Sequence, residues 1–487
     1  MSEAERPAPA HWARGLTRTF LWIWLAIVLV GAPTGATELV VVEQPVDAPA
    51  LWGLHGRCVS GSRLVRLGAD GAATVLTGEF DGACDPAVSF DGREILFSGR
   101  KLATDQWQIW RMALDTEEAH AVTDHPGGVF APLWVGSVFH LNDQAPTRRI
   151  AYLANASAER PLPALHTANL DGSNELRISY APGLDLAPEV LPNGRIVYPS
   201  VTQSGSPRVT LMGLNIDGTD LSVFADPHDS PPFPHAVGVG PDGRVYFIES
   251  EVTISGGGAL ASVSLRRPLR SRKVLAATDD GLFLDPAPLS DGAFLASFLA
   301  RRSAAYELVR VDPANGRIIE TVHRSDGMHV LDAHEIAPRP VVPGRSTVVD
   351  LSKTTGVFFC LSSHITDRPT LAHLRDGGGS RLRVIEHHIG DDPSIRERVL
   401  GEAPIEADGS FHIEVPARTP VRFQVLDAEG ATIGEQRSWT WVMPREWRGC
   451  IGCHEHREMV APNVLAEAVV KPAVRLVGPE TRAGGGE

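Results

Sequence analysis

Positive charge is in short supply in this sequence. Its 59 acidic side chains outnumber 45 lysines and arginines, lysine is especially scarce, and the formal net charge is −14. A surface that binds nucleic acid broadly carries a basic excess, so this composition argues against that class. Long apolar runs are also missing beyond the first forty residues, which argues against further membrane-spanning helices. No Ser-His-Asp order, phosphate-binding glycine loop or paired-carboxylate motif stands out, so no common hydrolase or nucleotide chemistry is indicated.

The N-terminus reads as a targeting segment. Arg14 and Arg18 precede an apolar run at 20–30, and small residues at 31–36 surround a cleavage site after Ala36. This is the layout of a secretory signal, and the run is shorter than the roughly twenty residues of a membrane span. We expect the mature protein in the periplasm or otherwise exported. Membrane contact is expected only in the alternative in which the segment is retained as an anchor.

A repeat of about 49 residues occupies the region from 40 to 335. Each clear unit has an Asp-Gly or Asn-Gly turn before a short apolar run, and these turns begin at Asp91, Asn193, Asp242 and, in degraded form, Asp291. The last two intervals are both 49 residues and the first is 102, about two periods, so the run at 149–153 is expected to fill the gap. Asp-Gly and Asn-Gly between apolar runs are strong hairpin signals because both turn residues must tolerate positive φ.

A second turn within the repeat sets the number of strands. It begins at Asp171 and again at Asp217, 46 residues later. Two hairpin turns per repeat imply about four strands, and four-stranded units arranged radially form a β-propeller. The stretch D-P-A-V-S-F-D-G at 85–92 resembles the blades of TolB-type propellers. We therefore predict an all-β chain with a six- or seven-bladed TolB/WD40-like β-propeller, with an array of β-sandwiches as the alternative.

The composition changes after the last repeat. A proline-rich stretch at 336–345 suits a linker or a strap, and alternating apolar patterns follow near 356–359, 381–385, 410–415 and 421–427. Period-two alternation with flanking Gly turns predicts an antiparallel sandwich. The expected organisation is a signal peptide or anchor at 1–36, a propeller at 40–335, a linker at 336–345, a β-sandwich middle domain at 346–440, a haem attachment segment at 441–476 and a disordered tail at 477–487.

A C-x-x-C-H motif lies near the C-terminus, as Cys450, Cys453 and His454. Two thiols at this spacing reach the two vinyl groups of a porphyrin and form thioethers, and the following histidine can bind the iron as axial ligand. The motif predicts one covalent haem c. A thioredoxin-like redox pair, half of a zinc site and a local disulfide are the alternatives, but the βαβ context and the remaining zinc ligands are missing from the pattern.

The second axial ligand is left open by the sequence. The local candidates are Met459, His456 and Met443, with His373, His387 and His388 as additional candidates from the sandwich. A second strong ligand would favour electron transfer, whereas an open position would allow chemistry on a small molecule.

Three further cysteines, Cys58, Cys84 and Cys360, are far apart in sequence. One disulfide and one thiol is a reasonable arrangement for an exported chain, but sequence does not tell which residues pair. Cys360 and His364 have a C-x-x-x-H spacing that could hold a metal, and chance is the favoured interpretation.

The order of these parts resembles the alpha subunit of hydrazine synthase and its relatives. The most specific stretches are A-D-G-S-F-H-I-E-V-P-A at 407–417, P-V-R-F-Q-V-L-D at 420–427, R-S-W-T at 437–440 and R-G-C-I-G-C-H-E at 448–455. They look like the family's middle domain running into its first haem site. The family enzyme has a further C-terminal haem domain, which is not expected here because no second C-x-x-C-H follows. The resemblance therefore implies the fold and the haem attachment, and not hydrazine synthesis.

The function expected from these features is that of an exported monohaem c-type protein with an electron-transfer or redox role and a redox protein as partner. A haem oxidoreductase acting on a small nitrogen or oxygen species is one alternative, so enzyme activity stays open. A propeller binding module is another. Substrate, reduction potential and oligomeric state cannot be deduced from the sequence.

Overall fold

The computed structural model describes residues 37–48, 58–143, 145–155, 162–202, 208–225, 233–250, 257–388, 396–436, 438–453 and 460–476. The expected signal peptide and the expected C-terminal tail lie outside the described residues. From Thr37 onwards the chain groups as one compact unit. Within the described part, no helix is long and apolar enough to cross a membrane.

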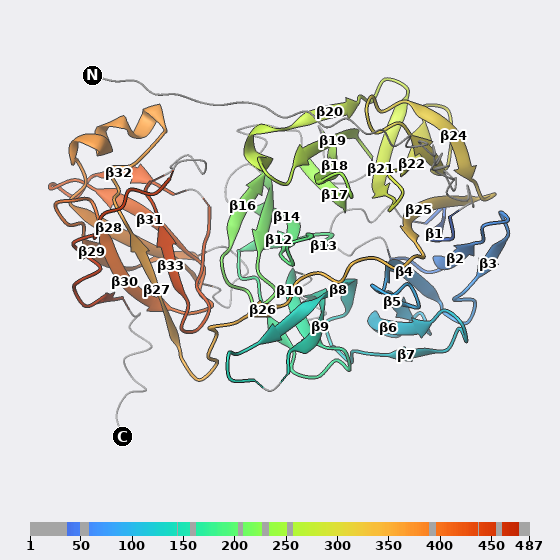
Figure 1. Cartoon of the computed structure of the whole chain (residues 1–487), viewed down its shortest axis with the longest axis horizontal. Coiled ribbons are helices and arrows are strands. Elements are labelled where there is room, and N and C mark those ends of the chain that lie inside the picture. Colours follow the sequence, from blue (N-terminus) through green and yellow to red (C-terminus); the bar gives the residue numbers. More distant parts are fainter. Residues whose placement is uncertain are drawn as a thin grey trace, which may run out of the picture. The chain divides into compact units, whose positions relative to one another are not determined.

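In the described part of the chain, six blades make up the propeller (Figure 1); four are four-stranded sheets and two have a fifth short strand, β13 (Glu189–Val190) in one and β26 (Arg345–Ser346) in the other. From the innermost strand outwards, the first blade holds β25 (Met328–Glu335), β1 (Leu39–Pro45), β2 (Arg63–Leu67) and β3 (Ala73–Val75), and the second holds β4 (Gly82–Val88), β5 (Glu94–Arg100), β6 (Gln108–Ala113) and β7 (Ala119–Ala121). The third blade holds β8 (Val129–Phe139), β9 (Thr147–Asn155), β10 (Pro163–Asn169) and β11 (Leu176–Arg177), and the fourth holds β12 (Gly183–Asp185) and β13 (Glu189–Val190), then β14 (Ile196–Thr202), β15 (Arg208–Leu214) and β16 (Ser222–Ala225). The fifth blade holds β17 (Phe233–Val239), β18 (Arg244–Ser250), β19 (Ala259–Ser264) and β20 (Lys273–Ala276), and the sixth holds β21 (Gly281–Pro288), β22 (Phe294–Ala300), β23 (Glu307–Val311) and β24 (Ile318–His323). The ring is closed by β25, which pairs antiparallel with β1.

The predicted hairpin turns are confirmed by their backbone angles. Gly92, Gly194, Gly243 and Gly292 all have positive φ, between 72° and 86°, and each lies just before the second strand of its blade. Only glycine adopts this region without steric cost, which is why the Asp-Gly and Asn-Gly pairs recur. The run at 149–153, expected to fill the gap in the repeat, lies within β9.

A bulge recurs in the innermost strands. Asp85, Ala131, Asp285 and Asp332 have φ values near +50°, unusual for residues with a side chain, and the strand pairing is irregular around the bulges. The carboxylate of Asp85 accepts the N–H of Ala131 at 3.0 Å, and that of Asp285 accepts the N–H of Asp332 at 3.1 Å. Each of these bonds joins one blade to the next, so they help to offset the backbone cost.

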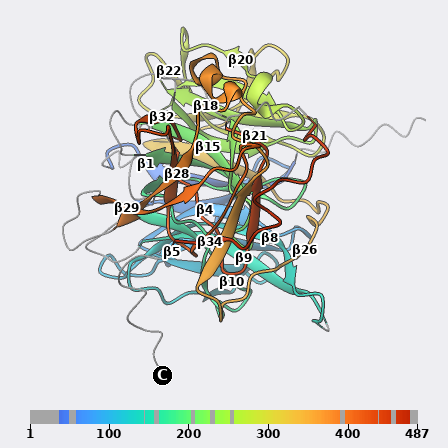
Figure 2. The ribbon, with the colours of Figure 1, turned by 90° about the vertical axis from the view of Figure 1, so that its left-hand side faces the viewer.

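The middle domain is a sandwich of two four-stranded sheets, which faces the viewer in Figure 2. One sheet holds β33 (Trp447–Cys450), β27 (Thr355–Cys360), β30 (Phe411–Pro416) and β34 (Val474–Arg475), and the other holds β29 (Arg396–Pro404), β28 (Arg381–His388), β31 (Val421–Leu426) and β32 (Thr432–Glu435). Their inner faces enclose a core that includes Phe358, Ile413 and Phe423. Residues 441–476, expected as a separate attachment segment, contribute β33 and β34 to this sandwich.

Shorter elements complete the described chain. A 3-10 turn, η1 (Pro268–Arg270), precedes β20, and a longer one, η2 (Pro369–Asp376), precedes β28. The proline-rich stretch leads into β26 (Arg345–Ser346), which pairs parallel with β8.

Candidate functional site

The C-x-x-C motif begins on a strand of the sandwich. β33 pairs parallel with β27, and the register places Cys450 beside Cys360. Beyond the strands, the N–H of Leu361 donates to the carbonyl of Cys450 at 2.9 Å. Cys450 is therefore held by a strand that lies ninety residues earlier in the chain.

The loop between the two cysteines is fixed by the segment that follows β27. The N–H of Ser362 donates to the carbonyl of Ile451 at 3.2 Å, and the N–H of Cys453 donates to the carbonyl of Ile365 at 2.9 Å. A Cβ at Gly452 would lie 2.2 Å from that same carbonyl oxygen. This close approach requires glycine between Ile451 and Cys453, so the motif's internal residue is set by packing.

The two thiols suit covalent attachment of a haem. Cys450 and Cys453 are half-buried and pack against the sandwich core. Partial exposure beside an apolar core is compatible with the edge of a porphyrin. His454, the predicted axial ligand, lies outside the described residues, as do His456 and Met459.

The remaining candidates for the second ligand are spread over the structure. Met443 is fully buried and belongs to the large propeller core cluster, an environment typical of a packing residue. His373 faces the carbonyl of Ile433 through Nε2 at 2.6 Å, and the ring of His387 packs edge-on against Trp439. The side chain of His388 lies outside the described residues. Met443, His373 and His387 thus have different neighbours in the described part of the chain.

The segment before the motif is anchored to the propeller. The carboxylate of Glu446 accepts the N–H of Asp220, and the indole of Trp441 donates to the carbonyl of Gly218 at 3.3 Å. The guanidinium of Arg448 donates to the carbonyl of Leu221. Burial raises the pKa of Glu446, although the hydrogen bonds from the backbone N–H groups of Asp220 and Met443 act in the opposite direction. The attachment strand is thus positioned by both domains.

Sequence reasoning missed a buried histidine next to this strand. His412 lies on β30, its Nδ1 faces the carbonyl of Lys471 at 3.1 Å, and its ring is 5.3 Å from that of Trp447. Its Nε2 is buried and has no hydrogen-bond partner among the described residues. The period-two pattern around 410–415 showed a strand but not that this histidine would be covered. Trp447, by contrast, is 59% exposed.

A separate cavity of about 780 Å³ occupies the centre of the propeller. The cavity is lined by residues that include Glu189, His334 and Arg339. Arg339 belongs to the proline-rich stretch, and its backbone N–H donates to the carbonyl of Phe90 at 2.8 Å. Burial raises the pKa of Glu189. Burial alone would lower the pKa of His334, but its 3.1 Å contact with Asp332 raises it. The cavity lining includes no residue of the C-x-x-C motif.

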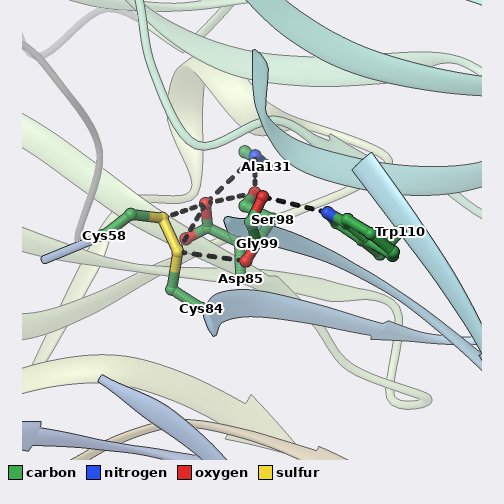
Figure 3. Close-up of a disulfide and its surroundings, with 7 residues drawn as sticks. All are labelled: Cys58, Cys84, Asp85, Ser98, Gly99, Trp110 and Ala131. Atoms are coloured by element: carbon green, nitrogen blue, oxygen red, sulfur yellow. Dashed lines mark hydrogen bonds between the residues drawn. A yellow bond between two sulfur atoms is a disulfide. The ribbon is translucent and has the colours of Figure 1, made fainter. Parts of the chain in front are cut away.

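A disulfide joins Cys58 and Cys84, a pairing that the sequence alone could not decide (Figure 3). It connects the segment before β2 to the innermost strand β4 of the next blade. The carboxylate of Asp85 lies 3.3 Å from the sulfur of Cys58 and accepts the hydroxyl of Ser98 at 3.0 Å. The disulfide is therefore part of the junction between the closing blade and its neighbour.

Comparisons with known proteins agree with this architecture. Residues 364–455 match the family model of the hydrazine synthase alpha subunit middle domain. The curated hydrazine synthase subunit alpha of Kuenenia stuttgartiensis is 21% identical over 515 aligned positions, which cover 81% of this chain and 63% of that protein. This chain thus spans less than two thirds of the length of its curated relative.

A solved structure shows the same fold. Hydrazine synthase from Kuenenia stuttgartiensis matches with a TM-score of 0.77 and 19% identity, over 89% of this chain and 71% of that one. TolB from Acinetobacter baumannii matches with a TM-score of 0.45 and 14% identity, over 63% of this chain and 68% of that one. The all-β propeller fold and the resemblance to the hydrazine synthase alpha subunit are thereby confirmed, with the family's middle domain matched at residues 364–455.

Proposed function

We propose that this protein is an exported, monohaem c-type protein with an electron-transfer or redox role in the periplasm. The observation that carries the proposal is the pair Cys450 and Cys453, held half-buried at one end of a sandwich by hydrogen bonds to the segment after β27. Cys450 and Cys453 would form the thioethers and His454 would bind the iron. The bound haem would supply one-electron chemistry, and the protein would hold it rigidly on a scaffold anchored to the propeller.

The exposed side chains around the motif support a docking role. Trp447, Val460 and Leu465 are between 59% and 90% exposed, on segments that flank the two cysteines in sequence. Exposed apolar side chains beside a redox group favour brief contact with a second protein. The partner would be a redox protein.

Expression with and without a c-type maturation system tests the proposal. The full chain should gain the mass of one haem only with the system, keep it after denaturation, and show a c-type spectrum. Cys450→Ser with Cys453→Ser should abolish the gain, and Gly78→Ala, a site with no contact closer than 3.9 Å for the new methyl group, should not. An unmodified mass under full maturation would refute haem attachment.

The haem enzyme alternative is separated by ligand binding. A reduced spectrum that shifts with carbon monoxide or nitric oxide would show an open iron position and favour chemistry on a small molecule. An unchanged spectrum would show two strong ligands and favour electron transfer.

The propeller cavity favours a second candidate function, that of a binding module. A pocket of this size with convergent charged groups such as Glu189 and Arg339 suits a small polar ligand. If the protein proves haem-free, Glu189→Gln should weaken the thermal stabilisation produced by any ligand found in a small-molecule screen.

A further inference from the structure

Cys360 is the one thiol that the haem motif does not use, and it lies next to the motif. In the pairing of β27 with β33, Cys360 is the direct partner of Cys450. Directly paired residues of parallel strands point to the same face of the sheet. Both residues pack on the sandwich core, Cys360 buried and Cys450 at its margin.

The spacing of the pair fits a disulfide. Neighbouring strands lie about 4.8 Å apart, within the range of roughly 4.4–6.8 Å between Cα atoms that disulfides span. The competing partner of Cys450 is Cys453, whose backbone N–H is bonded to the carbonyl of Ile365. Gly452 packs tightly on the same carbonyl, so a change in the loop's backbone would disturb both contacts.

We propose that Cys360 forms a disulfide with Cys450 in the haem-free, exported chain, and that this bond blocks haem attachment until it is reduced. The proposal deepens the proposed function and rests on it for its consequence, although the bond itself does not require a haem.

The chemistry is thiol–disulfide exchange with an oxidising protein disulfide, which is the required co-reactant. The more exposed Cys450 thiolate attacks that disulfide and forms a mixed disulfide, releasing one thiolate of the oxidant. The Cys360 thiolate then displaces the second thiolate, so two electrons and two protons pass to the oxidant as its dithiol. A sulfur held in this bond cannot add to a haem vinyl group, and a reducing dithiol restores both thiols by the reverse exchange.

Peptide mapping tests the bond directly. The full chain is exported without the maturation system, its thiols are trapped by alkylation at low pH, and it is digested without reductant. We expect a peptide linking Cys360 to Cys450 that separates on reduction, beside the linked peptides of Cys58 and Cys84 as internal control. Alkylated Cys360 in all molecules, or Cys450 linked only to Cys453, would overturn the proposal.

Haem loading tests the consequence. With the maturation system present and reductant limiting, Cys360→Ser and Cys360→Ala should raise haem occupancy several-fold, and excess reductant should remove the difference. Ser363→Ala is the matched control, because Ser363 is fully buried in the adjoining segment and its hydroxyl has no hydrogen-bond partner among the described residues.

Unchanged occupancy in folded Cys360 variants would overturn the blocking role. If no variant carries haem even with excess reductant, the proposed function fails, whereas the linked peptide still decides whether the Cys360–Cys450 bond forms.

Discussion

The carboxylate of Glu446 accepts the backbone N–H of Asp220 at 2.8 Å. Its other oxygen accepts the N–H of Met443 at 2.6 Å. One buried side chain thus joins a propeller turn to the segment that leads into the C-x-x-C strand, and it stabilises both backbone donors.

Replacing Glu446 should weaken this junction. Glu446→Ala leaves two buried N–H groups without acceptors and is expected to cost about 3 kcal/mol of the free energy of unfolding. Glu446→Gln retains one acceptor oxygen and should cost less. The pKa of Glu446 is raised in the folded protein, so its stabilisation is complete below the unfolded value near 4.5 and declines as pH rises through the folded value. Urea unfolding at pH 4 and pH 7 should show a smaller cost of Glu446→Gln at pH 7, and an equal cost would contradict this assignment.

The disulfide between Cys58 and Cys84 should contribute strongly to stability. It closes a loop of 26 residues between two blades, and a loop of this length corresponds to about 3–4 kcal/mol in the chain-entropy model. The double variant Cys58→Ser with Cys84→Ser should therefore unfold at lower urea concentration under oxidising conditions. Reductant should destabilise the wild type more than the double variant, in which only the proposed Cys360–Cys450 bond remains to be reduced. An equal effect of reductant on both would show that the bond between Cys58 and Cys84 does not carry this stabilisation.

Gly452→Ala should disturb the attachment loop. The new methyl group would meet the carbonyl of Ile365, so the loop must shift, with an expected cost of about 1–3 kcal/mol. Haem occupancy under full maturation should fall, while Gly78→Ala should leave it unchanged. Normal occupancy and an unchanged melting temperature in Gly452→Ala would show that the loop is looser than its hydrogen bonds indicate.

Acid should destabilise the propeller partly through His166. Burial lowers the pKa of His166 to about 4, and the nearby Arg177 and His125 lower it further. The hydrogen bond with the carbonyl of Ala164 acts in the opposite direction and raises it. The unfolded chain then binds a proton from pH 6.5 downwards while the folded protein does not, so this stabilisation is present above pH 6.5 and is lost as pH falls to about 4. The loss is up to about 3 kcal/mol.

His166→Gln should flatten the dependence of the free energy of unfolding on pH between 4 and 6.5. His120→Gln, at an exposed position on β7, serves as the control. Identical acid profiles for wild type and His166→Gln would show that His166 does not carry this dependence.

Local chemistry was enough to predict much of the fold. The glycine of each Asp-Gly or Asn-Gly pair must adopt positive φ, so Gly92 and Gly243 identified hairpins without knowledge of their neighbours. Alternation of apolar residues likewise identified β30 and β31 as strands with one buried face. Cys450, Cys453 and His454 lie within five consecutive residues, and a motif this short can be recognised without tertiary structure. The prediction of haem attachment therefore rests on the sequence alone.

Contacts between distant segments were decided only by the folded chain. The closure of β25 on β1, the choice of Cys84 as partner of Cys58, and the number of blades all depend on how strands meet in space. Cys360 lies beside Cys450 because two strands ninety residues apart pair in parallel, and Met443 is buried because a turn of the propeller covers it. No local pattern records such pairings, since their free energy comes from surfaces that exist only once both segments are folded.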